Sequence, residues 1–380
     1  MMTAVAAQPG YPGINVEELR APVRVISAVA TSTAAFVGVI GPDFFGTLMP
    51  VRSLAEFRDL VFLQDVSEAM AGSIDLFFQN GGRKALVVCV EELAGPEALD
   101  LLEHANFNLL CLPVTSEAPA IPMALHEAAL ALCQRKRALY LADPPMAWSD
   151  GGNVVAAALS ASPGFLAGAA NAALYLPRIE ADAISGHGRL QGFPACGAVA
   201  GLFARNDSSR GVWKAPAGPE AVLNGVSSPG RPLSASDFAD LSGLGLNGLR
   251  ALPGGKLAVW GARTRAGADV YASEWRYVPV RRLAMMIESS VERGLQWTVF
   301  EPNGEMLWAG IRGTIANFLY GLWKQGAFRG STPGEAFFVR CDQTTMSAAD
   351  IAAGRIVISL GFAALRPAEF LILRIFAKAA

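Results

Sequence analysis

The chain has 380 residues, a formal net charge of −2, and only 17% charged against 52% hydrophobic residues. This length favours two packed domains over one. Because so few charges cannot keep a large surface solvated, we expect neighbouring subunits to cover much of it. The near-neutral balance offers no broad basic footprint, so we expect no nucleic-acid partner.

Cysteine usage and apolar runs indicate where the protein is made. The five cysteines are widely spaced without a C-x-x-C pair, which predicts reduced, buried small hydrophobes of an intracellularly made protein. The charge-free stretch Val25–Pro42 contains threonines, a glycine and a strand-like pattern, so we expect no membrane insertion. Residues 1–10 show no secretory pattern, and we expect export only by release of whole particles.

The N-terminal half alternates strand and helix signals. Ile14–Glu18 reads as a short extended segment that must find a sheet, its own or a neighbour's. Ser53 and Glu56 form a capping-box match that predicts a helix start. A helix over 66–79 is expected to stop at Asn80-Gly81-Gly82. Apolar runs at 36–40, 85–90, 108–113, 138–142 and 172–176 alternate with helix-compatible segments, which favours a mainly parallel sheet covered on both faces.

Residues 205–255 are rich in glycine and proline, and we expect a long irregular connection there. Beyond it, apolar spacing predicts helices over 281–292 and 311–325 around a short strand at 296–300. Strands are expected at 336–341, 355–360 and 370–376, completing a small α+β domain. Its tryptophans are expected to anchor the core and subunit interfaces; they are Trp275, Trp297, Trp308 and Trp323.

The last predicted strand has two different faces. Phe370, Ile372, Arg374 and Phe376 point one way, and Leu371, Leu373 and Ile375 point the other.

No catalytic or metal-binding pattern emerges. The three histidines, His104, His126 and His187, lack metal-ligand spacing, and no nucleophile elbow or Walker A motif is present. Asp143 and Asp150 are expected to be solvated loop residues, because nothing nearby supplies a nucleophile, metal or base. We therefore expect no enzyme activity, no metal and no cofactor.

One formal motif remains. Gly243–Gly248 matches G-x-G-x-x-G, yet it follows a polar, helix-like segment at 237–242 and precedes Pro253-Gly254-Gly255, which favours a flexible turn. The alternative is a cytosolic α/β oxidoreductase that binds a nucleotide at this motif. A second alternative is a non-contractile shell or tube protein.

Several segments, taken in order, resemble the phage tail sheath family. The segments are 12–18 (PGINVEE), 31–38 (TSTAAFVG), 77–82 (FFQNGG), 211–218 (GVWKAPAG), 259–264 (VWGART), 274–282 (EWRYVPVRR), 300–303 (FEPN) and 367–370 (PAEF). Residues 95–205 carry few such matches.

The resemblance implies a helical tube of sheath subunits, stacked as hexameric rings around an inner tube. It implies a cap or terminator at one end, a baseplate at the other, and a contraction that drives the tube through a target envelope. It places the chain in a virion tail or an extracellular contractile particle assembled in the bacterial cytoplasm. Such a sheath subunit is a structural protein.

The resemblance also implies a division of the chain. Residues 1–20 form an N-terminal arm, 21–265 an outer α/β domain, 266–365 an inner α+β domain facing the tube, and 366–380 a C-terminal strand arm. The arms are expected to add strands to neighbouring subunits; their residues are Ile14, Asn15, Val16, Glu17 and Glu18, and Phe370, Leu371, Ile372, Leu373, Arg374 and Ile375. For the second arm, an ordinary edge strand within one chain is the alternative.

Four basic residues are candidates for contact with an acidic surface of the inner tube. They are Arg281, Arg282, Lys324 and Arg329, and ordinary solvated positions are the alternative for them.

Overall fold

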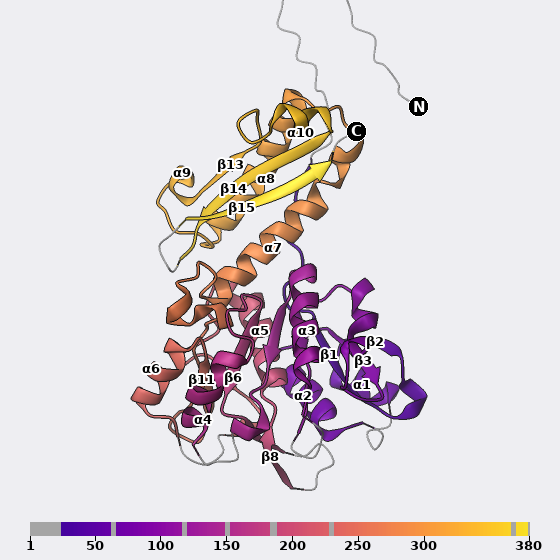
Figure 1. Cartoon of the computed structure of the whole chain (residues 1–380), viewed down its shortest axis with the longest axis vertical. Coiled ribbons are helices and arrows are strands. Elements are labelled where there is room, and N and C mark those ends of the chain that lie inside the picture. Colours follow the sequence, from indigo (N-terminus) through magenta and orange to yellow (C-terminus); the bar gives the residue numbers. More distant parts are fainter. Residues whose placement is uncertain are drawn as a thin grey trace, which may run out of the picture.

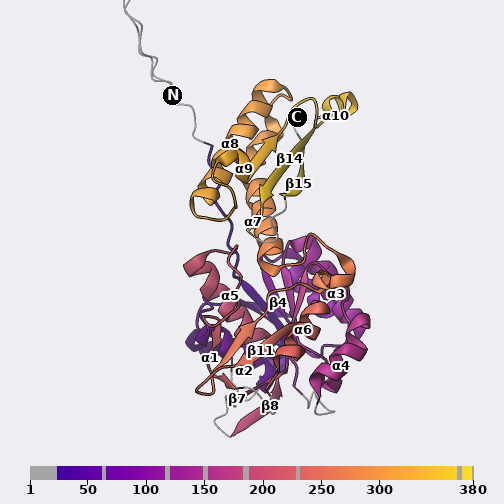
Figure 2. The same cartoon turned by 90° about the vertical axis from the view of Figure 1, so that its left-hand side faces the viewer.

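The computed structural model describes residues 24–61, 66–115, 120–148, 153–182, 188–227, 232–365 and 370–378. In Figure 1 the chain forms a large lower body around one sheet and a smaller upper body around another. The long helix α7 (Val278–Gly294) connects the two bodies, as the side view in Figure 2 also shows. The predicted fold class, an α/β domain followed by a smaller α+β domain, is confirmed.

The large body contains a nine-stranded sheet among the described residues, in the order β2-β3-β1-β4-β5-β6-β11-β12-β9. From β3 to β11 neighbouring strands are parallel; they are β3 (Ala85–Val90), β1 (Ala34–Val39), β4 (Leu109–Cys111), β5 (Leu139–Ala142), β6 (Ala172–Leu176) and β11 (Asn247–Ala251). The flanking strands β2 (Thr47–Val51), β12 (Leu257–Trp260) and β9 (Val222–Leu223) are antiparallel. The predicted mainly parallel sheet is therefore confirmed.

Helices cover both faces of this sheet, which explains its continuously apolar strands. One face packs against α1 (Leu54–Leu60), α2 (Glu68–Gln79) and α5 (Cys196–Arg210). The other packs against the 3₁₀ helix η3 (Pro96–His104), α3 (Met123–Lys136), α4 (Val154–Ala161) and α6 (Ala235–Gly243). Phe36 and Val37 of β1 show the alternation, because they belong to the cores on opposite faces.

Helices α2 and α5 touch through their backbones. A methyl group at Gly197 would lie 2.2 Å from the carbonyl oxygen of Ser73, and one at Gly201 would lie 2.3 Å from that of Phe77. Spaced four residues apart, the two glycines lie on the same side of α5. Larger residues there would force the helices apart.

The small body is an antiparallel sheet in the order β13-β14-β15, formed by Phe337–Arg340, Arg355–Ala363 and Phe370–Lys378. Its core joins one face of the sheet to α7 and α8 (Glu305–Lys324). Val278, at the start of α7, belongs to the large body's core, whereas Ile287 and Val291 belong to the small one. Helix α7 therefore contributes to both cores.

The remaining elements are short. A second antiparallel sheet joins β7 (Ile179–Asp182), β8 (Arg189–Phe193) and β10 (Val226–Ser227). The short helices are η1 (Pro42–Phe44), η4 (Met146–Trp148), η5 (Ser162–Gly164), η6 (Arg265–Gly267), η7 (Asp269–Tyr271), η8 (Gln296–Phe300), α9 (Pro333–Ala336) and α10 (Ala348–Ala352).

Two predictions of local structure are wrong. Residues 205–255 are not one irregular connection, because they contain the end of α5, the helix α6 and the strands β9, β10 and β11. These elements are short and separated by glycine and proline, so no long period marks them. The expected strand at 296–300 is the 3₁₀ helix η8, in which only Thr298 is buried.

Candidate functional site in the small sheet and at the junction

Strand β15 pairs with β14 along its whole length, from Phe370 opposite Ala363 to Lys378 opposite Arg355. Leu371, Leu373 and Ile375 are buried, whereas Ile372 and Phe376 are 56% and 71% exposed. Their alternation matches the predicted pattern of faces.

The residues expected to form a C-terminal arm thus lie in the chain's own sheet, the arrangement named above as the alternative. Strands β13 and β15 are its two edge strands, so each has one long edge unpaired among the described residues. Unpaired edges can accept a further strand. Strand exchange between subunits stays a prediction, and Ile14–Glu18 lie outside the described residues.

A buried ion pair joins the two bodies. Arg282 on α7 donates to both carboxylate oxygens of Asp207 on α5, at 2.9 and 2.6 Å, and to the carbonyl oxygen of Thr31 at 2.7 Å. The Thr31 hydroxyl donates to the same carboxylate at 2.7 Å. The side chains of Arg282 and Asp207 are only 3% and 5% exposed. Arg282 is therefore a buried structural residue in this conformation and is not available to an inner tube.

Arg281 is also enclosed, with 15% of its side chain exposed. It stacks on Trp275, donates to Asn171 at 3.1 Å and faces Glu288 at 4.0 Å. Arg137, at the end of α3, lies 3.2 Å from the same Glu288. Burial raises the pKa of Glu288 and the two arginines oppose that rise. Arg281 thus belongs to a charge cluster between α3 and α7.

Lys324 and Arg329 are the exposed members of the predicted tube-contact set. The Lys324 ammonium lies 5.4 Å from the centre of the Trp323 ring and 5.5 Å from that of Tyr320. Arg329 is bound through its backbone, whose N–H donates to the carbonyl oxygen of Ala363. Their contact with a tube stays a prediction.

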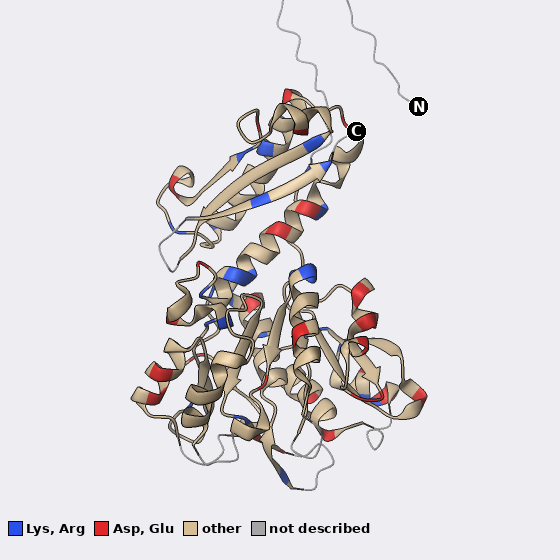
Figure 3. Cartoon of the chain, in the orientation of Figure 1, with Lys and Arg blue, Asp and Glu red and all other residues tan. Residues whose placement is uncertain are grey.

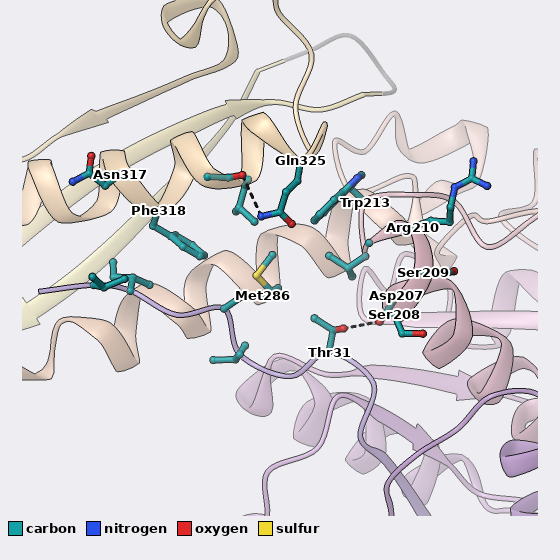
Figure 4. Close-up of a pocket in the computed structure, with 18 of the residues that line it drawn as sticks. Thr31, Asp207, Ser208, Ser209, Arg210, Trp213, Met286, Asn317, Phe318 and Gln325 are labelled. Atoms are coloured by element: carbon teal, nitrogen blue, oxygen red, sulfur yellow. Dashed lines mark hydrogen bonds between the residues drawn. The ribbon is translucent and has the colours of Figure 1, made fainter.

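The N-terminal segment Arg24–Thr31 runs along the small body. The Arg24 guanidinium lies 3.5 Å from the centre of the Trp297 ring and pairs with Glu301 at 2.9 Å. Between this segment and α8 lies a cavity of about 750 Å³. Figure 4 shows Phe318 and Met286 lining it, with the hydrogen bond between Thr31 and Asp207 at one end. Nothing in the sequence patterns indicated this cavity.

The G-x-G-x-x-G motif has a packing role. It spans the end of α6, a turn and the start of β11, so no helix N-terminus follows it to receive a pyrophosphate. Gly245 has a φ of +69°, and a methyl group on it would lie 2.7 Å from the backbone nitrogen of Ala268. The Asn247 amide donates to the carbonyl oxygens of Leu174 and Arg263. The oxidoreductase alternative is not supported.

Asp143 differs from its prediction as a solvated loop residue. Its carboxylate accepts hydrogen bonds from the backbone N–H groups of Ala195 and Cys196, at 2.7 and 3.1 Å, at the start of α5. Burial raises its pKa, and Arg178 opposes the rise. The reason is local: the carboxylate satisfies two N–H groups at the start of that helix. Asp150 lies outside the described residues.

The other chemically notable residues are structural. His126 is buried and shares a 2.8 Å hydrogen bond with Tyr140; burial lowers its pKa to about 4. All five cysteines are buried and free, as expected. Across the described parts of the chain, no group of acidic, histidine or cysteine residues has the arrangement of a metal site. His104 is exposed and His187 lies outside those parts.

Within the same ranges, no helix is both long and apolar enough to cross a membrane.

Arg265 is a buried polar residue that the sequence did not single out. Its guanidinium donates to the carbonyl oxygens of Ser162, Phe165 and Leu244, at 2.6 to 3.2 Å. It therefore ties η5 and the end of α6 to η6.

Comparison with known proteins gives a consistent result. The family described as phage tail sheath protein central domain matches residues 92–265, and the phage tail sheath C-terminal domain matches residues 272–378. None of the curated proteins matches the chain.

Solved structures match over nearly the whole chain. The sheath of the anti-feeding prophage in its contracted state is 32% identical, with a TM-score of 0.74, over 96% of this chain and 98% of that one. The sheath of the extracellular contractile injection system PVC, also contracted, is 28% identical, with a TM-score of 0.77, over 97% and 98%.

A sheath tail protein from Desulfitobacterium hafniense shares the fold, at 11% identity and a TM-score of 0.66 over 96% of this chain and 100% of that one. All three are structural sheath proteins and not enzymes. With two family matches that together span most of its length, the chain belongs to the phage tail sheath family as a contractile sheath subunit.

Proposed function

We propose that this chain polymerises into the contractile sheath of an extracellular injection particle. The observation that carries the proposal is its identity, over nearly full length, to two sheaths: 28% to that of the extracellular contractile injection system PVC and 32% to that of the anti-feeding prophage. The sheath tail protein of Desulfitobacterium hafniense is only 11% identical. The particle is assembled in the bacterial cytoplasm and released whole.

Strand exchange holds neighbouring subunits together in this proposal. The unpaired edges of β13 and β15 supply backbone donors and acceptors, and Ile14–Glu18 of another copy supplies a strand of suitable length. Residues 366–380 serve as the second arm when β15 pairs with the sheet of a neighbouring subunit instead of with β14 of its own chain. A tether of backbone hydrogen bonds can persist while side-chain contacts change.

Residues 266–365, which include most of the small body, face the inner tube in this arrangement, and residues 21–265 form the outer domain. Lys324 and Arg329 are retained as tube contacts because both are exposed on the small body. Hexameric rings of the chain stack from a baseplate to a terminator. Contraction then needs two packings of the same folded chain and no nucleotide.

Electron microscopy of the purified protein tests polymerisation, and Val16→Pro tests the arm. Proline removes a backbone donor from a donated strand, so we expect helical tubes from the wild type and few or none from Val16→Pro. Thr3→Pro, which lies outside the expected strand, is the matched control. Tubes of normal length from Val16→Pro would refute the strand-arm proposal alone.

Co-purification with the inner tube protein tests the tube contact. Lys324→Glu with Arg329→Glu should abolish recovery of the tube, because both exposed charges are reversed. Arg58→Glu on α1 of the large body is the control, since that residue is also exposed. Equal recovery from both variants would remove these residues from the interface.

A further inference from the structure

The face of the small sheet that points away from its core is basic and partly apolar. The strands β13, β14 and β15 contain four basic residues and no acidic one: Arg340, Arg355, Arg374 and Lys378. The register places all four on the face opposite the core, because their neighbours Ile356, Leu373 and Ile375 are buried. Figure 3 shows these basic positions along the strands.

Arg340 and Arg374 are placed to engage a partner. Both flank Ser359 in adjacent strands, and both are exposed. Among the described residues, no carboxylate lies within salt-bridge distance of either guanidinium, whereas Arg355 pairs with Asp350 at 2.7 Å. Ile372 and Phe376 are exposed on the same face. We call this surface the basic face.

The large body carries a surface of opposite charge. Residues 91–104 contain five acidic residues and no lysine or arginine: Glu91, Glu92, Glu97, Asp100 and Glu103. All five are exposed, and η3, which carries the last three, turns Ala98, Leu99 and Leu102 inward. Leu101 lies among them, 38% exposed. Glu103 pairs with Arg135, and the others have no ion-pair partner in the described chain. We call this surface the acidic ridge.

The two surfaces belong to different bodies, and no ion pair within the described chain joins them. We propose that the basic face of one copy docks on the acidic ridge of a second copy. The contact joins two different surfaces, so each copy offers both halves and the contact can repeat from one copy to the next, as a helical sheath requires. This inference rests on the proposed function, because it names an interface of that polymer.

Each exposed ion pair contributes little and is screened by salt. The contact therefore depends on several pairs acting together and on burial of Phe376, Ile372 and Leu101 at its centre. Complementary potentials also reject a wrong partner. An acidic inner tube is the competing occupant of the basic face, and the experiment separates the two.

Charge reversal gives two variants. In the first, Arg340→Glu and Arg374→Glu cancel the positive charge of the basic face; in the second, Glu97→Arg and Asp100→Arg cancel most of the negative charge of the acidic ridge. Each variant alone should lose self-association at low salt by roughly tenfold or more, because the net attraction between the two surfaces is removed and like charges meet at the substituted positions. A one-to-one mixture should regain association, because the unchanged face of one variant meets the unchanged ridge of the other, and the two altered surfaces carry opposite charges at the substituted positions.

Sedimentation velocity at about 50 mM salt measures this, with circular dichroism to confirm folding. Two controls carry the same charge changes on other exposed residues: Arg58→Glu with Arg83→Glu, and Asp43→Arg with Asp59→Arg. Both should associate like the wild type.

Three results would overturn the inference. The first is normal association of either variant alone, and the second is a mixture of folded variants that stays unassociated. The third is loss of tube binding by the first variant with no recovery of self-association in the mixture, which would assign the basic face to the tube. If the wild type forms no helical tubes, the proposed function fails, yet the mixture still reports whether the two surfaces bind.

Discussion

Arg282 of α7 and Asp207 of α5 form an ion pair with a shortest distance of 2.6 Å, and both side chains are almost completely buried. The pair connects a helix of the small body's core to a helix of the large body. Thr31, hydrogen-bonded to both, adds the N-terminal segment to the same junction. A buried charge is tolerated only when its partner is present.

Removing the arginine should therefore be costly. We expect Arg282→Met to lower the free energy of unfolding by about 3–5 kcal/mol, because Asp207 would be left buried and unpaired. Urea unfolding of the unassembled chain, followed by tryptophan fluorescence, measures the change.

Two control variants show whether the loss of stability is specific to the ion pair. Arg293→Met changes an exposed arginine of the same helix and should alter stability by no more than about 0.5 kcal/mol. The double variant Arg282→Met, Asp207→Leu should regain most of the loss. An unfolding midpoint unchanged by Arg282→Met would show that the pair contributes nothing.

The contact between α2 and α5 predicts opposite effects of one substitution at two glycines. Alanine is the better helix former by about 1 kcal/mol, so Gly313→Ala in α8, where nothing lies within 4 Å of the added methyl, should stabilise the chain. Gly201→Ala should destabilise it by about 1–3 kcal/mol, because the methyl would press on the Phe77 carbonyl. Thermal unfolding of both variants gives the signs; a stabilising Gly201→Ala would contradict the close packing.

His126 predicts a loss of stability in mild acid. Burial lowers its pKa from 6.5 to about 4, so the folded chain keeps this ring neutral where the unfolded chain would protonate it. The free energy of unfolding is therefore unaffected by this histidine above pH 6.5. It decreases as the pH drops toward 4, by roughly 3 kcal/mol in all.

Replacing the histidine isolates this effect. His126→Gln can still hydrogen-bond Tyr140 but cannot titrate, so its stability should fall less between about pH 7 and pH 4.5 than that of the wild type. Urea midpoints across that range measure the difference. Parallel curves for the two proteins would assign the acid sensitivity to other groups.

At position 265, keeping a positive charge should not be enough to keep the stability of the fold. The planar guanidinium of Arg265 reaches three carbonyl oxygens at once, which a lysine ammonium cannot match in geometry. We expect Arg265→Lys to destabilise the chain by about 1–3 kcal/mol through unsatisfied carbonyl groups. Arg83→Lys on the surface is the control, and equal unfolding midpoints would contradict this role.

Local signals predicted many elements because the physics behind them is local. Ser53 caps α1, its hydroxyl accepting from the N–H of Glu56, as the spacing indicated. The buried runs became β3, β5 and β6, where burial on both faces leaves no polar positions. Helices α7 and α8 extend over their predicted apolar stripes.

The junction could not be predicted in the same way. Arg282 and Asp207 lie 75 positions apart, and each resembles an ordinary surface charge in its own segment. Asp143 looked solvated for the same reason, since its partners are backbone groups of a distant helix. The edge strand β15 had the right faces in sequence, but which chain it pairs with is not encoded in that alternation.

Helix α7 has a mechanical consequence. Its 17 residues run without a break from one core into the other, a length of about 25 Å at the rise of an α-helix. Bending it would break backbone hydrogen bonds at the point where Arg282 and Glu288 fasten it to α5 and α3. A rotation of the large body is thus transmitted rigidly to the small sheet. The flexibility needed when the sheath changes its packing must therefore lie at the contacts between chains.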